Sequence, residues 1–409
     1  MSVIPNKDDY FKELKTIQKA LHGNSVEAKR AAEYRAKAAK NAPVSLHSVE
    51  VLSDDELDEA YRAILEQPEF KLSEEHRKKL LERGLDEETI RVNQYRTIPP
   101  YREARKLVSQ EQTDYFKKKG LGKVKEETAG LKYQSNVMLI IGFSIAARLK
   151  KRGIKIFGVP GFFMFGEKYP CLNLPASGIM IPTRNMDGKI VGIQVRTDSG
   201  SIRYLTISSK NYENGVEERI SRAHWVLSSD PVEVYDEEER PQIILTEGPL
   251  KADVATYLLR KRGYKGYFAF AAIPGVNTTA MFFEDCEVLK RLGYDKITLA
   301  LDMDKCTNTN VMRGGKKLRD ELTKRGFSVN IMTWDRESAD ELVEKQKKLI
   351  EEMDLRMPEK LPRNVFFEAA ALSYVLKDAG VKEDRYQWNP KTKGIDDYLL
   401  HAEKLDFAS

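Results

Sequence analysis

Cysteine is scarce in this sequence. The 409 residues contain three, Cys171, Cys286 and Cys306, and no two of them form a Cys-x-x-Cys pair. This spacing excludes a disulfide framework and a zinc site built from cysteines of this chain. Unpaired thiols are typical of the cytoplasm, which is where we expect the protein. A GxxxxGK[ST] phosphate loop is also missing, and five scattered histidines indicate no Ser-His-Asp or Cys-His constellation.

Long apolar runs are missing as well. The most apolar stretch, residues 137–147, is too short to cross a bilayer, and residues 1–15 show no basic segment followed by an apolar one. We therefore expect no membrane span and no secretion signal. Lys and Arg number 68 against 63 Asp and Glu, a net charge of +5. This surplus permits a nucleic-acid partner without requiring one, because charges can be segregated into a basic face.

The first part of the chain has helical spacing of apolar residues. Residues 1–72 are predicted to form an N-terminal helical region, with helices over 9–21 and 26–42. Helices are predicted to begin at Ser53, Ser73 and Asp86, each followed by an acidic first turn, and helical patterns with Gly84 at one end continue through residues 73–153. We expect this second stretch to be the helical part of a larger core.

The pattern changes at residue 154. From 154 to 235, short apolar strands alternate with turns such as Asp187-Gly188, which predicts an antiparallel β-rich module. Residues 236–334 then alternate strands and helices, as is typical of a parallel sheet with helices on both faces. Residues 335–409 are predicted to be a helical extension. The expected fold class is α/β, with a parallel sheet preceded by the β-rich module and the helical region.

Acidic residues follow two of the predicted parallel strands. Glu247 ends the first strand, and Asp302-Met303-Asp304 follows the third. Side chains that bind ligands in open parallel sheets lie beyond the carboxyl ends of the strands. On an extended segment, Asp302 and Asp304 point the same way and can present two carboxylates to one Mg²⁺ or Mn²⁺ ion. Further along, Asp396 and Asp397 follow Gly394, where one of them also fits as a helix cap.

The ordered set of strand-Glu-Gly, strand-Asp-x-Asp and Gly-x-Asp-Asp resembles the TOPRIM domain, the metal-binding module of bacterial-type DNA primases, topoisomerases and some nucleases. The resemblance implies that Glu247 is the acid/base or metal-linked glutamate and that Asp302 and Asp304 are Mg²⁺ ligands. It also implies that Asp396 and Asp397 complete the acidic site.

Upstream, the sequence resembles the catalytic core of bacterial-type primases. Residues 178–209 match its β-module, with a Pro-x-Arg strand, an Asp-Gly turn, a Gly-x-x-x-Arg strand and a Tyr-Leu step, and residues 76–99 resemble its opening helix pair. The resemblance covers about 75–334 plus residues 394–397 and is nearest to primase-like proteins of phages, plasmids and other mobile elements. The family's zinc-binding domain has no counterpart here, so the chain would be a core without its usual template reader or would borrow one in trans.

Basic residues of the β-module are candidates for contact with nucleic acid or nucleotide. The arginines form one basic track if they share a face of the hairpins, and the tyrosine is available to stack on a base or sugar. The module's candidates are Arg184, Arg196, Arg203, Tyr204 and Lys210. Lys251, one turn into the helix after Glu247, fits a phosphate contact or a nearby carboxylate. His224-Trp225 is interpreted as packing.

The leading hypothesis is a primase-like, Mg²⁺-dependent nucleotidyltransferase. It would bind single-stranded DNA along the β-module and join NTPs into short RNA primers in phage, plasmid or mobile-element replication. Partners would include a replicative helicase, a polymerase or a zinc-domain protein. Two alternatives stay open: a TOPRIM nuclease that cleaves DNA with the same carboxylates, and a non-catalytic single-strand-binding accessory that tethers a partner.

Overall fold

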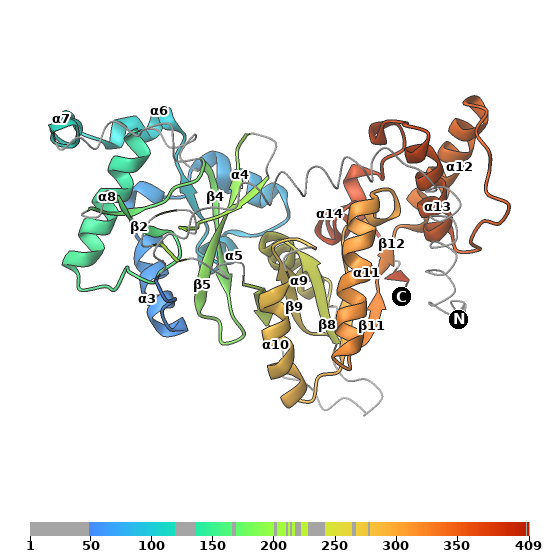
Figure 1. Ribbon diagram of the computed structural model, residues 1–409, viewed down its shortest axis with the longest axis horizontal. Coiled ribbons are helices and arrows are strands. Elements are labelled where there is room, and N and C mark those ends of the chain that lie inside the picture. Colours follow the sequence, from blue (N-terminus) through green and yellow to red (C-terminus); the bar gives the residue numbers. More distant parts are fainter. Residues whose placement is uncertain are drawn as a thin grey trace, which may run out of the picture. The chain divides into compact units, whose positions relative to one another are not determined.

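The computed structural model divides the described part of the chain into two compact units (Figure 1). We call residues 49–243 and 247–294 the N-terminal unit, and residues 244–246 and 295–408 the C-terminal unit. The described residues are 49–118, 136–165, 169–199, 203–209, 212, 215–216, 222–227, 242–263, 267–276, 279–405 and 407–408. The helices predicted over 9–21 and 26–42, and the candidate Lys210, lie outside them.

A series of helices opens the N-terminal unit. They are α3 (Asp54–Leu65), α4 (Glu74–Glu82), α5 (Glu87–Val92), α6 (Tyr101–Ala104), α7 (Gln110–Lys118) and α8 (Asn136–Lys151), with 3₁₀ turns η1 (Pro68–Phe70) and η2 (Arg105–Leu107). The Ser53 hydroxyl accepts a hydrogen bond from the Glu56 N–H, and the Glu56 carboxylate accepts one from the Ser53 N–H. The side chains of Ser73 and Asp86 accept hydrogen bonds from the His76 and Thr89 N–H groups at the starts of α4 and α5. The predicted helix starts are therefore confirmed.

A four-stranded antiparallel sheet follows, in the order β1-β4-β5-β6. Its strands are β1 (Arg96–Ile98), β4 (Gly178–Arg184), β5 (Ile190–Thr197) and β6 (Tyr204–Thr206), and a separate hairpin pairs β2 (Phe162–Phe165) with β3 (Tyr169–Leu172). The β4–β5 and β5–β6 hairpins confirm the predicted β-rich pattern. The helical prediction is wrong at β1, because Arg96, Thr97 and Ile98 pair with residues of β4 instead.

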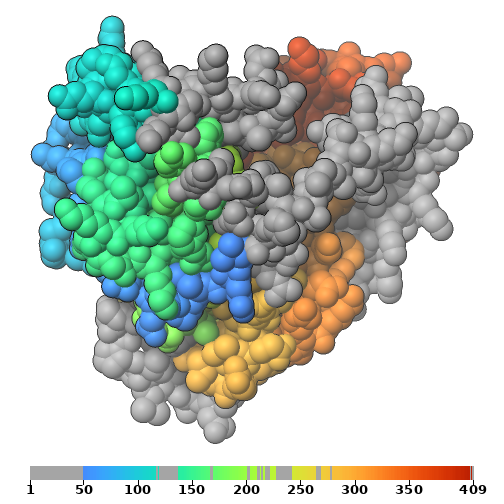
Figure 2. Space-filling view, turned by 60° about the vertical axis from the view of Figure 1, so that its left-hand side comes forward, coloured from blue at the N-terminus to red at the C-terminus, as the bar shows by residue number. Residues whose placement is uncertain are grey.

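The apolar core of this unit lies between the sheet and two helices. Leu57 and Ile64 of α3, Ile145 of α8, and Ile193 and Val195 of β5 are buried in one cluster. Burial of these side chains is the main source of stability for the sheet. Figure 2 shows the surface over this region, where α6 and α7 (teal) lie above α8 (green).

The strands that alternate with helices are shared between the units. Strand β8 (Gln242–Glu247) is divided between them, with residues 244–246 in the C-terminal unit. The N-terminal unit holds α9 (Pro249–Lys261), β9 (Tyr267–Ile273) and α10 (Ala280–Arg291), and β7 (His224–Leu227) pairs antiparallel with β9. In the C-terminal unit β10 (Lys296–Leu299) pairs parallel with β11 (Ser328–Ile331), and the Ala300 N–H donates to the Leu245 carbonyl. The predicted parallel pairing is confirmed for β10 and β11. The expectation of an all-parallel arrangement is wrong for β7, which the prediction placed in the β-rich module.

Helices complete the C-terminal unit. They are α11 (Thr309–Lys324), α12 (Arg336–Glu352), α13 (Val365–Asp378) and α14 (Ile395–His401), with the 3₁₀ turns η4 (Met303–Cys306), η5 (Glu383–Arg385) and η6 (Pro390–Thr392) and the short pair β12 (Thr333–Trp334) and β13 (Phe407–Ala408). The predicted helical stretch over 335–409 contains α12, α13 and α14 and also the strand β13. None of the helices in the described part of the chain has the length and apolar character to cross a membrane.

Candidate functional site

The Asp302–Asp304 segment forms a tight turn at the carboxyl end of β10. Asp302 precedes the 3₁₀ turn η4, and Asp304 lies within it. The Lys305 N–H donates to the Asp302 carbonyl at 3.0 Å, and the Thr307 N–H donates to the Asp304 carbonyl at 2.9 Å. The expectation that Asp302-Met303-Asp304 stays extended is therefore wrong. Alternation along a strand does not set the directions of these two carboxylates.

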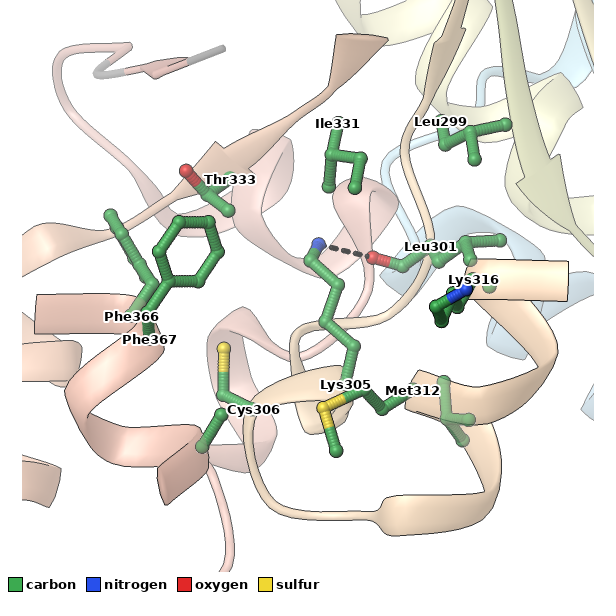
Figure 3. Close-up of a pocket in the computed structure, with 13 residues that line it drawn as sticks. Leu299, Leu301, Lys305, Cys306, Met312, Lys316, Ile331, Thr333, Phe366 and Phe367 are labelled. Carbon is green, nitrogen blue, oxygen red and sulfur yellow. Dashed lines mark hydrogen bonds between the residues drawn. The ribbon is translucent and has the colours of Figure 1, made fainter. Parts of the chain in front are cut away.

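Lys305 fastens this turn to the ends of two strands, and Figure 3 shows its contact with Leu301. Its ammonium donates to the Leu301 carbonyl at 2.8 Å and to the Met332 carbonyl at 2.9 Å. It also lies 4.6 Å from the centre of the Trp334 ring, within the range of a cation–π contact. Because Leu301 follows β10 and Met332 follows β11, one side chain holds η4 against both strand ends.

A small cavity lies beside the Lys305 stem. Its volume is about 50 Å³, and its lining includes Leu299, Leu301, Cys306, Ile331 and Phe366 (Figure 3). Burial raises the pKa of the Cys306 thiol to about 12, so the thiol is neutral near pH 7. The cavity lining contains no carboxylate, and it is therefore separate from the acidic groups of the turn.

The structure brings the Gly-Ile-Asp-Asp element to the same turn. The Met303 N–H donates to the Lys393 carbonyl at 2.8 Å, and the Lys393 ammonium lies 2.6 Å from Asp304 Oδ2. Gly394 is the N-cap residue of α14, and Asp396 and Asp397 fall in the first turn of that helix. Neither aspartate is thus the cap residue. A Cβ at position 394 would come too close to the Asp396 carboxylate, so a larger residue there would require that side chain to shift.

Asp304 has one oxygen in an ion pair and one without a hydrogen bond. Oδ2 is paired with Lys393, whereas Oδ1 is buried and has no hydrogen-bond partner among the described residues. A buried acceptor left in this state costs about 1–3 kcal/mol. A cation or a donor supplied by a ligand would remove that cost, so Asp304 fits a divalent-ion ligand. Across the residues that the structure describes, no group of three or more His, Cys, Asp or Glu side chains is arranged to hold a metal ion.

Glu247 and Lys251 lie in the N-terminal unit, where β8 turns into α9. Gly248 has a φ of 84° and donates its N–H to the Ile273 carbonyl at 2.8 Å, and Pro249 opens the helix. The left-handed backbone at this turn favours glycine. Glu247 and Lys251 are each half-buried on either side of it. Their predicted roles stay predictions.

A buried hydrogen-bond network one turn further along α9 was missed by the sequence interpretation. The Tyr95 hydroxyl donates to Asp253 Oδ2 at 2.6 Å, and His224 Nε2 lies 3.0 Å from Asp253 Oδ1. Because the Arg184 backbone N–H donates to His224 Nδ1, the imidazole proton is on Nε2, and Nε2 donates to Asp253. His224 is buried, as the packing interpretation expected, but it is also a hydrogen-bonding link between β4, β7 and α9.

The candidate arginines differ in their surroundings. The Arg184 guanidinium donates to the Asn93 carbonyl at 3.2 Å and to Gln94 Oε1 at 3.4 Å, and burial lowers the pKa of Arg184. Arg196 lies directly opposite Tyr204 on the β5–β6 pair, and the exposed Arg203 comes just before that strand. Arg196, Arg203 and Tyr204 therefore form a compact group at one hairpin, while Arg184 is engaged in the fold.

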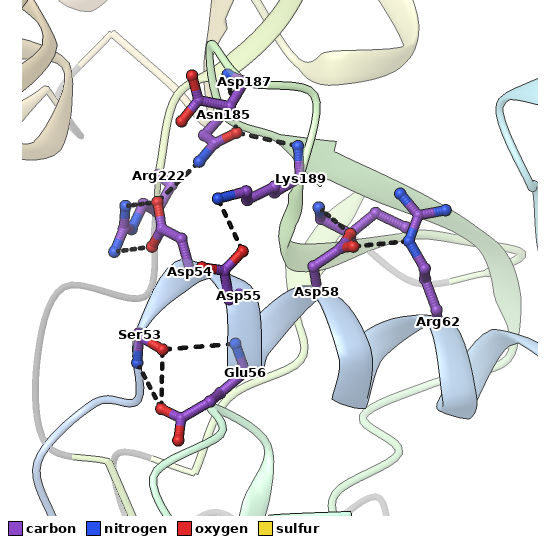
Figure 4. A network of polar contacts seen from close by, with 11 residues as sticks. Ser53, Asp54, Asp55, Glu56, Asp58, Arg62, Asn185, Asp187, Lys189 and Arg222 are labelled. Carbon is purple, nitrogen blue, oxygen red and sulfur yellow. Dashed lines mark hydrogen bonds and ion pairs between the residues drawn. The ribbon is translucent and has the colours of Figure 1, made fainter.

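The β4–β5 turn is fixed by the acidic start of α3 (Figure 4). Asn185 donates to Asp54 at 2.7 Å, and the Lys189 ammonium lies 2.8 Å from Asp55 Oδ1. One turn later, Asp58 Oδ1 accepts the Ile190 N–H at 2.7 Å. The acidic first turn that the sequence indicated as a helix start thus also orients the hairpin that carries Arg184.

Comparisons with known proteins give structural neighbours only. No family model matches the chain, and no curated protein matches it. A structure of the zinc-binding and RNA polymerase domains of the Aquifex aeolicus primase is similar at 14% identity and a TM-score of 0.41. The match covers 82% of this chain and 75% of that one. The RNA polymerase domain of Mycobacterium tuberculosis primase DnaG is similar at 14% identity and a TM-score of 0.38, and the match covers 68% of this chain and 76% of that one. The E. coli primase catalytic core is similar at 16% identity and a TM-score of 0.36, and the match covers 68% of this chain and 69% of that one.

Proposed function

We propose that the chain is a primase-like, Mg²⁺-dependent nucleotidyltransferase with a TOPRIM-type domain. It joins ribonucleotides into short RNA primers on single-stranded DNA in the replication of a phage, plasmid or other mobile element. The observation that carries the proposal is the acidic turn after β10. There Asp304 keeps a buried oxygen without a hydrogen bond, and the Gly-Ile-Asp-Asp element is fastened to the same turn through Lys393.

The acidic residues would hold the ion. Asp302 and Asp304 would be the ligands of Mg²⁺ or Mn²⁺, with Asp396 and Asp397 beside them. Such ions commonly take one or two carboxylates from the protein and their other ligands from water and phosphate. When bound, the ion supplies charge stabilisation for phosphoryl transfer. Glu247 would position or activate the attacking 3′-hydroxyl.

Basic and aromatic side chains would bind the polyanions. Arg196 and Arg203 would contact the backbone of the template strand, and Tyr204 would stack on a base. Arg184 would act through the hairpin, since its guanidinium already donates to residues 93 and 94. Lys251, in the first turn of α9, would contact phosphate.

The test is primer synthesis on single-stranded DNA with labelled NTPs and Mg²⁺ or Mn²⁺. Asp302→Ala and Asp304→Ala should each lower the rate by about 100-fold or more, as expected for loss of preorganised charge stabilisation. Asp340→Ala, at an exposed carboxylate of α12, is the matched control and should keep the wild-type rate. Full activity in both site variants would show that the carboxylates are assigned wrongly. DNA cleavage without NTPs would instead identify a nuclease, and binding without synthesis an accessory protein.

A further inference from the structure

Lys393 lies where the proposed ion would bind. Its ammonium is 2.6 Å from Asp304 Oδ2, and its own carbonyl accepts the Met303 N–H at 2.8 Å. The Lys393 side chain is 37% exposed and that of Asp304 14% exposed, so the pair is at the border between protein and solvent. The backbone of Lys393 is therefore fixed to the acidic turn, while its side chain retains access to water.

We propose that Lys393 is a built-in counter-cation of this site, an inference that rests on the proposed function. In the absence of a divalent ion, the ammonium neutralises Asp304. When Mg²⁺ arrives with a nucleotide, the ammonium leaves the carboxylate and contacts the triphosphate. Two cations beside one carboxylate repel each other, so lysine and ion compete for Asp304.

The contrast with Lys305 shows why Lys393 is able to move. The Lys305 ammonium is held by two backbone carbonyls and faces the Trp334 ring, so its displacement would leave those groups without a donor. Within the described part of the chain, the Lys393 ammonium is paired with Asp304 alone, and it is carried on a flexible four-carbon stem. Its movement costs one ion pair, and that pair is replaced when the ammonium meets phosphate.

Anchoring of the backbone gives this movement a defined range. Because the Lys393 carbonyl is hydrogen-bonded to Met303, the Lys393 Cα stays beside the turn when the side chain swings away from Asp304. The same anchor keeps Gly394, the N-cap residue of α14, beside the turn that carries Asp304. A divalent ion would thus take the place of the Lys393 ammonium beside Asp304 without rearrangement of α14.

The experiment is a Mn²⁺ titration of Lys393→Met, which keeps the stem and removes the charge. Free Mn²⁺ is measured by its electron paramagnetic resonance signal, a readout independent of synthesis. Without nucleotide, the variant should bind Mn²⁺ about tenfold more tightly than wild type, a size typical of coupling between competing sites. With a non-hydrolysable triphosphate, nucleotide affinity should fall by about tenfold because a phosphate contact is lost.

Two variants complete the design. Lys391→Met, at an exposed lysine of η6, should match wild type in both titrations, and Lys393→Arg should restore the weaker Mn²⁺ binding because it retains the charge. Unchanged or weaker Mn²⁺ binding by Lys393→Met would overturn the counter-cation role. The proposed function would nevertheless stand if Asp304→Asn abolished Mn²⁺ binding, because that loss would show that Asp304 is an ion ligand. Absence of Mn²⁺ binding in wild type would overturn both.

Discussion

Asp253 in the N-terminal unit and Asp304 in the C-terminal unit are enclosed carboxylates with opposite hydrogen-bonding states. Both oxygens of Asp253 accept hydrogen bonds, one from Tyr95 and one from His224. Asp304 has one oxygen paired with Lys393 and one buried oxygen without a hydrogen bond. A carboxylate with satisfied acceptors stabilises the fold, whereas one with an unsatisfied acceptor gains stability only when a ligand binds. The difference separates a structural carboxylate from a candidate functional one.

The largest expected effect is on folding, at Asp253. Asp253→Ala should lower the free energy of unfolding by about 3–5 kcal/mol, because the Tyr95 hydroxyl and the His224 N–H lose their acceptor inside the protein. Urea denaturation followed by circular dichroism measures the change. Asp253→Asn, which retains one acceptor oxygen, should cost less than the alanine variant. A loss below about 1 kcal/mol in the alanine variant would mean that the network is not structural.

Asp285 provides a pH-dependent case in the same unit. Its carboxylate accepts the Trp225 indole N–H at 2.8 Å, and burial raises the pKa of Asp285 to about 6. A folded-state pKa above the ordinary 3.8 means that the protonated form contributes stability, which is lost as the pH rises through about 6. Asp285→Asn should therefore be more stable than wild type by about 2 kcal/mol near pH 8 and equal to it near pH 4. Thermal unfolding at both pH values measures this, and equal differences at the two would contradict it.

The smallest expected effect is the stability change at Asp304. Asp304→Asn removes a partly exposed ion pair and an unsatisfied anionic oxygen, so the free energy of unfolding should stay within about 1 kcal/mol of wild type. Mn²⁺ binding should nevertheless be lost. The same urea titration used for Asp253 allows direct comparison. A loss of stability as large as that of Asp253→Ala would show that Asp304 is structural and that the contrast between the two carboxylates is false.

Local patterns predicted much of the fold. The caps at Ser53, Ser73 and Asp86 are confirmed, because a cap is decided by a side chain and backbone groups three residues away. The β4–β5 hairpin is confirmed for a similar reason, since the Asp187-Gly188 turn and the strand pattern are both local. The strand β1 was missed because three residues carry little pattern, and its pairing partners lie about 80 residues further along the chain.

The candidate site shows the same division. Sequence located Asp302, Asp304 and the Gly-Ile-Asp-Asp element, but it assigned the wrong backbone conformation to the Asp-x-Asp segment. That segment is a 3₁₀ turn, and Lys305 fastens it to the Met332 carbonyl, 27 residues away. No periodicity in the sequence reports a contact of that separation. The hydrogen bonds of Asp253 were missed for the same reason, because Tyr95 is 158 residues from it.

What the sequence alone determined is most of the longer helices and strands, their order, and the positions of the acidic residues after them. It also predicts that the three separated cysteines do not build a zinc site. Tertiary structure decided which carboxylates have satisfied acceptors, and which lysine is locked and which can move. The physical reason is that burial and hydrogen-bond satisfaction depend on groups brought together by packing, whereas helix and strand patterns depend on neighbours in the chain.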